Sequence, residues 1–295
     1  MIDTTIDTAT VPSRPRRGGR VAHLRLYLSA GIIAMFVLVA VLGPVFYEFD
    51  PVTTDVAARL LPPLSSVDGT SYPLGTDPLG RDLLGQIIYG ARISLGVAAG
   101  TVLGGLVVGA VIGIISGYFG GRLDSFIMRL ADIQLAVPPI LLAILMVAVL
   151  GPGIQTLIVA LAITRWVFFA RVSRSSVLVA RERPFVEAAR VSGLSHRQIM
   201  MSHIARFTVS PLLVVATMQI GLVILAEAAL SFLGLGASAQ EPSWGLIIAN
   251  GRGVLLEAWW ISTLPGVALS LLVVSVAVFG DELRDRLQPD LRLDD

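Results

Sequence analysis

The chain has 295 residues, of which 55% are hydrophobic and 15% are charged, and its net charge is +1. A soluble domain carries about a quarter charged residues, so this composition and the mean hydropathy of +0.80 exclude an ordinary soluble protein. The chain has no cysteine, which excludes disulfides, thiolate metal sites and cysteine nucleophiles. All 22 basic residues are arginine, so the chain cannot supply the lysine of a Walker-type phosphate loop.

Apolar residues gather in six segments, at 27–46, 93–116, 133–150, 154–170, 209–232 and 261–280. A helix of about 20 apolar residues crosses the bilayer hydrocarbon. Gly151, Pro152 and Gly153 interrupt the third and fourth segments and predict a tight turn. The sequence therefore predicts an all-α polytopic membrane protein with six transmembrane helices.

The distribution of arginine predicts the orientation of the chain. Five arginines precede the first segment, whereas residues 48–82 hold six acidic residues and two arginines. Because positive charge stays in the cytoplasm, both termini are expected there. We predict a cytoplasmic tail at 1–26, a first transmembrane helix at 27–46, an extracytoplasmic loop at 47–91, a five-helix core at 92–280 and a cytoplasmic tail at 281–295.

The extracytoplasmic loop contains a pattern typical of a helix start. Asp77 suits an N-cap, and Pro78 suits the first helical position. Beyond them, apolar residues recur at helical spacing, at Leu79, Leu83, Leu84, Ile87, Ile88 and Leu95. We predict an amphipathic helix on the outer membrane surface; the alternative is an extension of the second transmembrane helix.

Glycines spaced four apart mark the second apolar segment. Such rows let helix backbones approach closely in lipid, so they predict a tightly packed helix without naming its partner. The two rows are Gly96, Gly100 and Gly104, and Gly105, Gly109, Gly113 and Gly117.

The loop at 172–208 is polar and arginine-rich although it joins two apolar segments, and it is too short to fold alone. Pro184 suits a first helical turn, and Gly193 suits a C-terminal stop. Ser195 and Gln198 have the spacing of a capping box, which starts another helix. The sequence predicts a helix, a glycine corner and a second helix.

The first of these two helices carries small residues. Phe185, Ala188 and Ala189 are expected near one another on one face, and Glu187 lies in the first turn, where the helix dipole favours a carboxylate. Small residues would leave a smooth ridge that fits a groove on a partner. The alternative is a loop that only joins two spans.

The string Glu187-Ala188-Ala189, followed after three residues by Gly193, resembles the EAA motif of ABC-importer permeases, although Ala205 and Arg206 replace its usual Leu-Pro ending. Other strings extend the resemblance over about residues 30–290, to the C-type permease subunit of the peptide/nickel importer family, the dipeptide and oligopeptide permeases. They are SYPLGTDPLGRD (71–82), GARISL (90–95), SGYFGG (116–121), AEAALSFLGLG (226–236), PSWG (242–245) and GDELRD (280–285).

This resemblance implies a type I ABC importer permease fold in the cytoplasmic (plasma) membrane. It implies a heterodimer with a second homologous permease, two ABC ATPase subunits and an extracytoplasmic substrate-binding protein, with no nucleic acid. ATP and magnesium would bind the ATPases, so this chain needs no cofactor. The cargo would be di- or oligopeptides, with nickel or glutathione as the alternative. Residues of ATPase coupling would be Phe185, Glu187, Ala188, Ala189 and Gly193.

Polar residues inside the predicted spans are candidates for a transport pathway or gate. Glu227 lies near the outer end of the fifth segment, and Gln219 and Thr217 lie deeper. The alternative for Glu227 is a structural hydrogen bond to a neighbouring helix. Arg165, beside Trp166, is expected at the inner end of the fourth segment, with its charge reaching the headgroups.

Two other functional classes fit the sequence less well. An intramembrane enzyme needs a Ser/His pair, an aspartate pair or a zinc-binding His-Glu-x-x-His helix inside the spans. The three histidines, His23, His196 and His203, fall outside the predicted segments, so no catalytic residue and no metal ligand is expected. A channel needs a polar filter at membrane depth, and none is evident.

Overall fold

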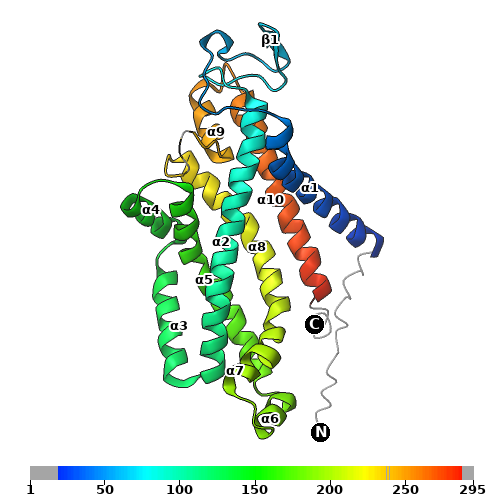
Figure 1. Ribbon diagram of the computed structural model, residues 1–295, viewed down its shortest axis with the longest axis vertical. Helices are drawn as coiled ribbons and strands as arrows, with labels where there is room; N and C mark the ends of the chain where they lie inside the picture. The colour runs from blue at the N-terminus through cyan, green and yellow to red at the C-terminus, as the bar shows by residue number, and fades with distance from the viewer. Residues whose placement is uncertain (1–18, 237, 239, 288–295) are drawn as a thin grey trace, which may run out of the picture.

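The computed structural model describes residues 19–236, 238 and 240–287; the remaining parts of the two predicted tails lie outside the described residues. Long helices stand along one axis, with a two-stranded hairpin at one end and the short helix α6 at the other (Figure 1). The helices are α1 (Gly19–Phe46), α2 (Leu83–Phe119), α3 (Gly121–Ala136), α4 (Pro139–Leu150), α5 (Ile154–Ala180), α6 (Pro184–Val191), α7 (His196–Gln198), α8 (Ala205–Phe232), α9 (Trp244–Gly251) and α10 (Trp260–Leu287).

Within the described residues, five stretches are long and apolar enough to cross a membrane, in α1, α2, α5, α10 and the run from His196 to Phe232. The helices α3 and α4 pass the same test only as a pair, bent by 87°, which makes a sixth crossing if the pair counts as one. The third apolar segment, 133–150, therefore contains this bend and is not one continuous helix. The reason is the Pro138-Pro139 pair, because a residue before proline avoids the helical conformation and Val137 is extended.

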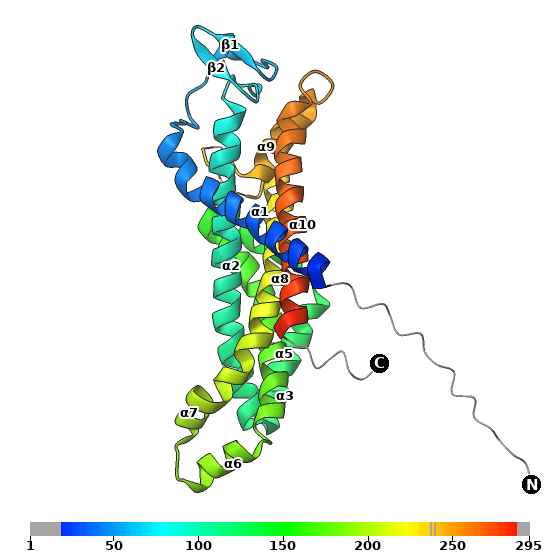
Figure 2. The same cartoon turned by 90° about the vertical axis from the view of Figure 1, so that its right-hand side faces the viewer.

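Several helices run further than their apolar segments. The tight turn at Gly151–Gly153 is confirmed, since α4 ends at Leu150 and α5 begins at Ile154. However, α5 continues to Ala180, ten residues beyond the predicted end, and α10 includes residues 281–287, which were assigned to a tail. His23 also lies within α1, not before it. Figure 2 shows α1 running obliquely across α2 and α10, which it contacts.

Close packing of the second span is confirmed for one glycine row, and its partner is α5. A Cβ atom at Gly109 would lie 2.3 Å from the carbonyl oxygen of Trp166, and one at Gly113 would lie 2.3 Å from that of Ala170. The other row is looser, because a Cβ at Gly96 would meet nothing within 4 Å. The helices α2 and α5 thus form a seam in which backbone touches backbone.

The segment 47–82, which we call the outer cap, folds above the bundle and was largely unforeseen. It contains η1 (Val56–Ala58) and an antiparallel hairpin of β1 (Ser65–Val67) and β2 (Thr70–Tyr72). The hairpin turns at Asp68 and Gly69, both with positive φ, as a type I′ turn requires. The Asp-Gly pair was the sequence signal for this hairpin.

The predicted amphipathic helix starting at Asp77 is wrong, and the alternative, an extension of the second transmembrane helix, describes the structure. The first residue of α2 is Leu83, and its N-cap is Asp82, whose side chain accepts the Gly85 amide proton at 2.6 Å. From there α2 runs unbroken to Phe119. Asp77 instead closes a turn by accepting the amide protons of Leu79 and Arg81.

Candidate functional site: the elbow

The segment 181–204, which we call the elbow, lies at the end of the bundle opposite the outer cap (Figures 1 and 2). It connects α5 to α8 through α6, α7 and a six-residue π-helical stretch at Ile199–Ile204. No break separates this stretch from α8, so the altered motif ending at Ala205 and Arg206 is plain helix. The elbow therefore leads directly into a membrane span.

The predicted helix, corner and helix are confirmed. Pro184 is the first residue of α6, and Gly193 follows its end with φ of +77°. The Leu194 amide donates to Ala189 and the Gly193 amide donates to Arg190, which is the Schellman pattern. Ser195 and Gln198 form the predicted capping box. Local backbone chemistry thus fixes the angle between α6 and α7.

A small apolar core anchors the elbow to the bundle. Val186 and Ala189 of α6 are buried together with Ile199 and Ile204, and they pack against the ends of α2 and α5. Phe185 is half-buried and stacks on Phe207, with ring centroids 5.1 Å apart. The elbow is therefore a packed part of the bundle.

The two alanines of the motif point in different directions. Ala188 is exposed beside Glu187, whereas Ala189 is buried in the core of the elbow. Ala189 lies three residues after the buried Val186 and shares its inward face, whereas Ala188 falls about 100° away on the exposed side, so the prediction that Ala188 and Ala189 share one face is wrong. The outward face of α6 is formed by Glu187, Ala188 and Val191, and the side chain of Val191 is 85% exposed.

A polar contact that the sequence did not reveal joins the elbow to α2. The hydroxyl of Tyr118 lies 2.7 Å from Nδ1 of His196, and the guanidinium of Arg190 lies 5.9 Å from the centre of the Tyr118 ring. These residues are far apart in the sequence, and no spacing rule connects them. The Tyr118 side chain is 7% exposed, and this buried ring contacts both α6, through Arg190, and α7, through His196.

A second polar group holds the same ends of α2, α3 and α5 together. The Asp124 carboxylate accepts from the Ser116 hydroxyl and from the Arg174 guanidinium, both at 2.5 Å. Arg181 donates to the carbonyl oxygen of Gly117 at 2.9 Å. Charged hydrogen bonds thus join α3 to α2 and α5, the two helices on which the elbow packs.

The three pathway candidates are not brought together. Glu227 is fully buried, and its carboxylate accepts from Ser94 of α2 at 2.9 Å and from Ser231 at 2.7 Å. The contact with Ser94 matches the alternative interpretation of Glu227, a structural hydrogen bond between two helices. Thr217 donates to the Val214 carbonyl oxygen of its own helix, and it lines a groove of about 990 Å³ between α1, α2, α8 and α10.

Gln219 has a different partner from the other two candidates. It is buried and accepts a hydrogen bond from Arg165 at 3.3 Å. The prediction that Arg165 lies at the inner end of its span is wrong, because α5 continues well past it. Its guanidinium meets the amide of a neighbouring helix instead of the headgroups.

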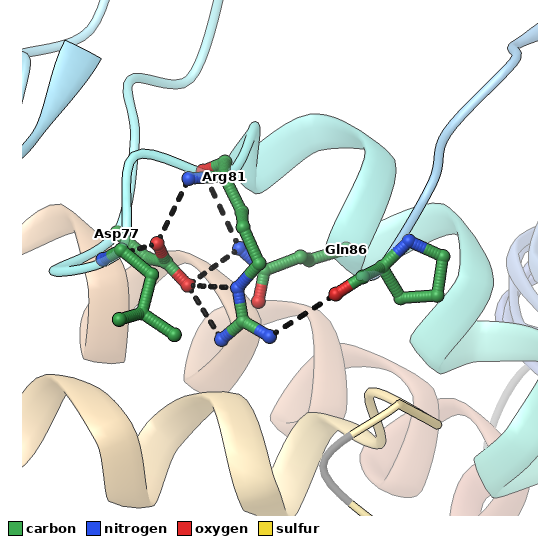
Figure 3. Close-up of polar contacts among 5 residues, drawn as sticks. Asp77, Arg81 and Gln86 are labelled. Atoms are coloured by element: carbon green, nitrogen blue, oxygen red, sulfur yellow. Dashed lines mark hydrogen bonds and ion pairs between the residues drawn. The ribbon is translucent and has the colours of Figure 1, made fainter. Parts of the chain in front are cut away.

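At the other end of the bundle, a buried ion pair braces the outer cap against α2 (Figure 3). Arg81 donates through Nε and Nη2 to Oδ2 of Asp77, both at 2.7 Å, and Gln86 of α2 donates to the same oxygen at 3.2 Å. Asp77 is 1% exposed and Arg81 is 8% exposed. Trp260 of α10 also donates to the Thr76 carbonyl oxygen at 3.3 Å, so the cap is tied to two spans.

Tyr47 adds a further tie between α1 and α2. Its hydroxyl donates to Asp82 at 2.7 Å. Burial, and then the hydrogen bond to this carboxylate, raise the pKa of Tyr47 above its ordinary value, so the phenol stays protonated as a donor. Within the part of the chain that the structure describes, no three His, Asp or Glu side chains are arranged to hold a metal ion.

Comparison with known proteins identifies the class of this chain. Residues 109–293 match the family described as the binding-protein-dependent transport system inner membrane component. The chain is 38% identical over 261 residues to a probable D,D-dipeptide transport system permease protein of Escherichia coli, covering 88% of this chain and 86% of the relative.

Two further relatives cover similar shares. A di/tripeptide transport system permease protein of Pseudomonas aeruginosa is 38% identical, over 89% of this chain and 88% of the relative. A nickel transport system permease protein of Escherichia coli is 39% identical, over 88% and 92%.

A solved structure shares the fold. One chain of the inward-facing MetNI methionine ABC transporter superposes with a TM-score of 0.56 at 20% identity, covering 68% of this chain and 96% of that one. At this identity the likeness shows the fold alone, which is that of an ABC importer permease. The chain therefore belongs to the binding-protein-dependent transport system inner membrane component family, and it is a multi-pass permease of the cytoplasmic membrane.

Proposed function

We propose that this chain is one of two homologous permease subunits in an ATP-driven importer of short peptides, and that the elbow docks on a separate ATPase subunit. The observation that carries the proposal is the outward face of α6. Glu187, Ala188 and Val191 are exposed at the tip of the bundle, yet the helix behind them is anchored by Val186 and Ala189. A surface that is both exposed and rigidly mounted can transmit a force from a partner to the spans.

The proposed arrangement places the elbow and both termini in the cytoplasm, where the ATPases would bind ATP and magnesium. The arginine-rich segment 172–208 supports this orientation through the positive-inside rule. The outer cap, at the opposite end, would then face the extracytoplasmic binding protein that delivers the cargo. The second permease would complete the translocation pathway.

Short peptides are the preferred cargo because two of the relatives above are named as permeases of dipeptides or tripeptides. Nickel is the second candidate, because a nickel permease is as similar as the peptide permeases are. Glutathione, itself a tripeptide, is a further alternative within the peptide class.

The absence of cysteine from the whole chain gives a clean test of the docking surface. A single cysteine would be introduced at Ala188 of the elbow or at Leu64 of the outer cap, which is 87% exposed. Each variant would be co-expressed with its ATPases and treated with a thiol-reactive crosslinker. We expect the Ala188→Cys chain to crosslink to an ATPase. The Leu64→Cys chain should form no such crosslink, and it should react with a membrane-impermeant thiol reagent added outside.

Transport provides the matching functional test. Glu187→Arg reverses an exposed charge on the docking face, and we expect it to abolish ATP-driven peptide uptake into proteoliposomes without loss of membrane insertion. Glu257→Arg, also exposed but outside the elbow, is the control. Uptake at the wild-type rate by Glu187→Arg, or crosslinking of Leu64→Cys to an ATPase, would refute the docking role.

A further inference from the structure

A second cavity, of about 340 Å³, lies between the outer cap and the bundle, away from the elbow. Its lining comes from α2, from the chain just before α9, and from Ile154 and Pro51. This volume lies within the range of about 300–1,000 Å³ that is usual for small-molecule sites. Its lining residues are Pro51, Tyr89, Arg92, Ile93, Gly96, Val97, Ile154, Gln240, Glu241 and Pro242.

The two charged residues of this cavity have opposite signs and come from different segments of the chain. Arg92 belongs to α2 and is exposed, and Glu241 belongs to the segment before α9 and is half-buried. Among the described residues, no ion pair joins them to each other or to another side chain. Among the residues that the structure describes, the Glu241 carboxylate accepts one side-chain hydrogen bond, a long one of 3.4 Å from the Ser238 hydroxyl.

Arg92 stands at the edge of the apolar part of α2, one residue before the segment 93–116 and about 14 Å along the helix from Leu83. Ionisable residues of spanning helices mark substrate pathways when they face a cavity. Arg92 borders this cavity and also the groove between α1, α2, α8 and α10, and among the described residues Glu241 is the one carboxylate that lines the cavity.

We propose that this cavity receives a short peptide as a zwitterion, with the terminal carboxylate on Arg92 and the terminal ammonium group on Glu241. The inference rests on the proposed function and specifies which cargo feature this subunit recognises. Two extended residues span about 7 Å, so one dipeptide can engage both charged residues of a small cavity. Charge-assisted hydrogen bonds at both ends would compensate two charges that are otherwise unpaired.

The remaining walls are consistent with recognition of the termini alone. Ile93, Val97 and Ile154 are apolar and would contact the peptide side chains without selecting a polar group. Such a site accepts peptides of many sequences, provided that both termini are free and charged. A peptide with a blocked amino or carboxyl terminus would leave one wall charge unpaired inside the cavity, which costs binding energy.

The test uses the complete importer in proteoliposomes, with a dipeptide and the same wild-type binding protein for every variant. Arg92→Gln and Glu241→Gln remove one charge each at similar size. Arg59→Gln and Glu257→Gln are the matched controls, since both residues are exposed and neither lines the cavity. Import and ATP hydrolysis are measured against the concentration of peptide-loaded binding protein, beside subunit co-purification and thermal stability.

We expect the two cavity variants to lower the maximal import rate at least tenfold, while the half-saturating concentration of binding protein, the stimulated ATP hydrolysis, assembly and stability stay near wild type. Loss of assembly or stability would overturn the site and make Arg92 a subunit or structural contact. Unimpaired import would overturn the site alone. A wild-type complex that imports no peptide would overturn the proposed function, and the site with it.

Discussion

The Tyr118 hydroxyl and the His196 imidazole lie 2.7 Å apart and fasten the elbow to the end of α2. Tyr118→Phe removes this hydrogen bond but keeps the ring under Arg190. Losing one such hydrogen bond costs about 1 kcal/mol of free energy, which shifts the equilibrium roughly fivefold toward an elbow detached from α2. We expect import per ATP hydrolysed to fall, by at most this factor, while ATP hydrolysis continues.

The control for this variant is Tyr27→Phe, because Tyr27 is 68% exposed on α1, far from the elbow in sequence. It should leave import per ATP unchanged. A Tyr118→Phe transporter with the wild-type ratio would show that the apolar core of the elbow suffices for its attachment.

Gly193 is expected to tolerate no side chain, although space surrounds it. A Cβ there would meet no atom within 4 Å, so the cost comes from its φ of +77°. Left-handed backbone costs a residue with a Cβ about 1–2 kcal/mol. Gly193→Ala should therefore lower the stability of the elbow by that amount, seen as faster amide exchange at α6, and should reduce import.

Gly253→Ala is the matched control for the corner, since Gly253 also has open space around it but no left-handed φ. It should behave as wild type. Equal effects of the two alanines would mean that loop flexibility, and not the corner, matters.

The seam between α2 and α5 offers a pair of substitutions within one helix. Gly109→Ala places a methyl group 2.3 Å from the Trp166 carbonyl oxygen, and such overpacking costs about 1–3 kcal/mol. Gly96→Ala adds the same group where nothing lies within 4 Å, and it should be neutral or slightly stabilising. Thermal unfolding in detergent measures both, and similar melting temperatures would contradict the seam.

The buried brace of the outer cap should be costly to break. Arg81→Leu removes the cation that pairs with the Asp77 carboxylate, which is only 1% exposed. Leaving a buried charge unpaired in this way destabilises the fold by about 3–5 kcal/mol. Arg59→Leu, at an exposed position of the same cap, should change little. Limited proteolysis of residues 47–82 reports on the cap, and resistance equal to wild type in Arg81→Leu would refute the brace.

The elbow was predictable because its signals are short-range. A proline at a first turn, a glycine at a stop and a capping box each act within four residues, so Pro184, Gly193 and Ser195 define the structure locally. The direction of Ala189 was not predictable in the same way. It depends on which face of α6 meets Ile199 and Ile204, and that is a matter of tertiary packing.

The predictions that failed outside the elbow have different causes. Asp77-Pro78 and Asp82 both suit a helix start, but Asp77 pairs with Arg81 in a turn, so the helix begins after Asp82. The bend between α3 and α4 was readable from Pro138-Pro139, but an average over apolar residues conceals a proline pair. The hydrogen bond between Arg165 and Gln219 joins residues 54 apart, which no periodicity in the sequence reveals.

The uninterrupted helical run from His196 to Phe232 makes the tip of the bundle and the buried carboxylate of Glu227 parts of one rod. At about 1.5 Å per residue this rod is roughly 55 Å long. A tilt imposed at its base reaches Ser94 through Glu227 unless it is absorbed at Pro211, the proline inside α8, or in the π-helical stretch Ile199–Ile204. The stiffness at these two places therefore decides whether a tilt at the base is felt at Glu227.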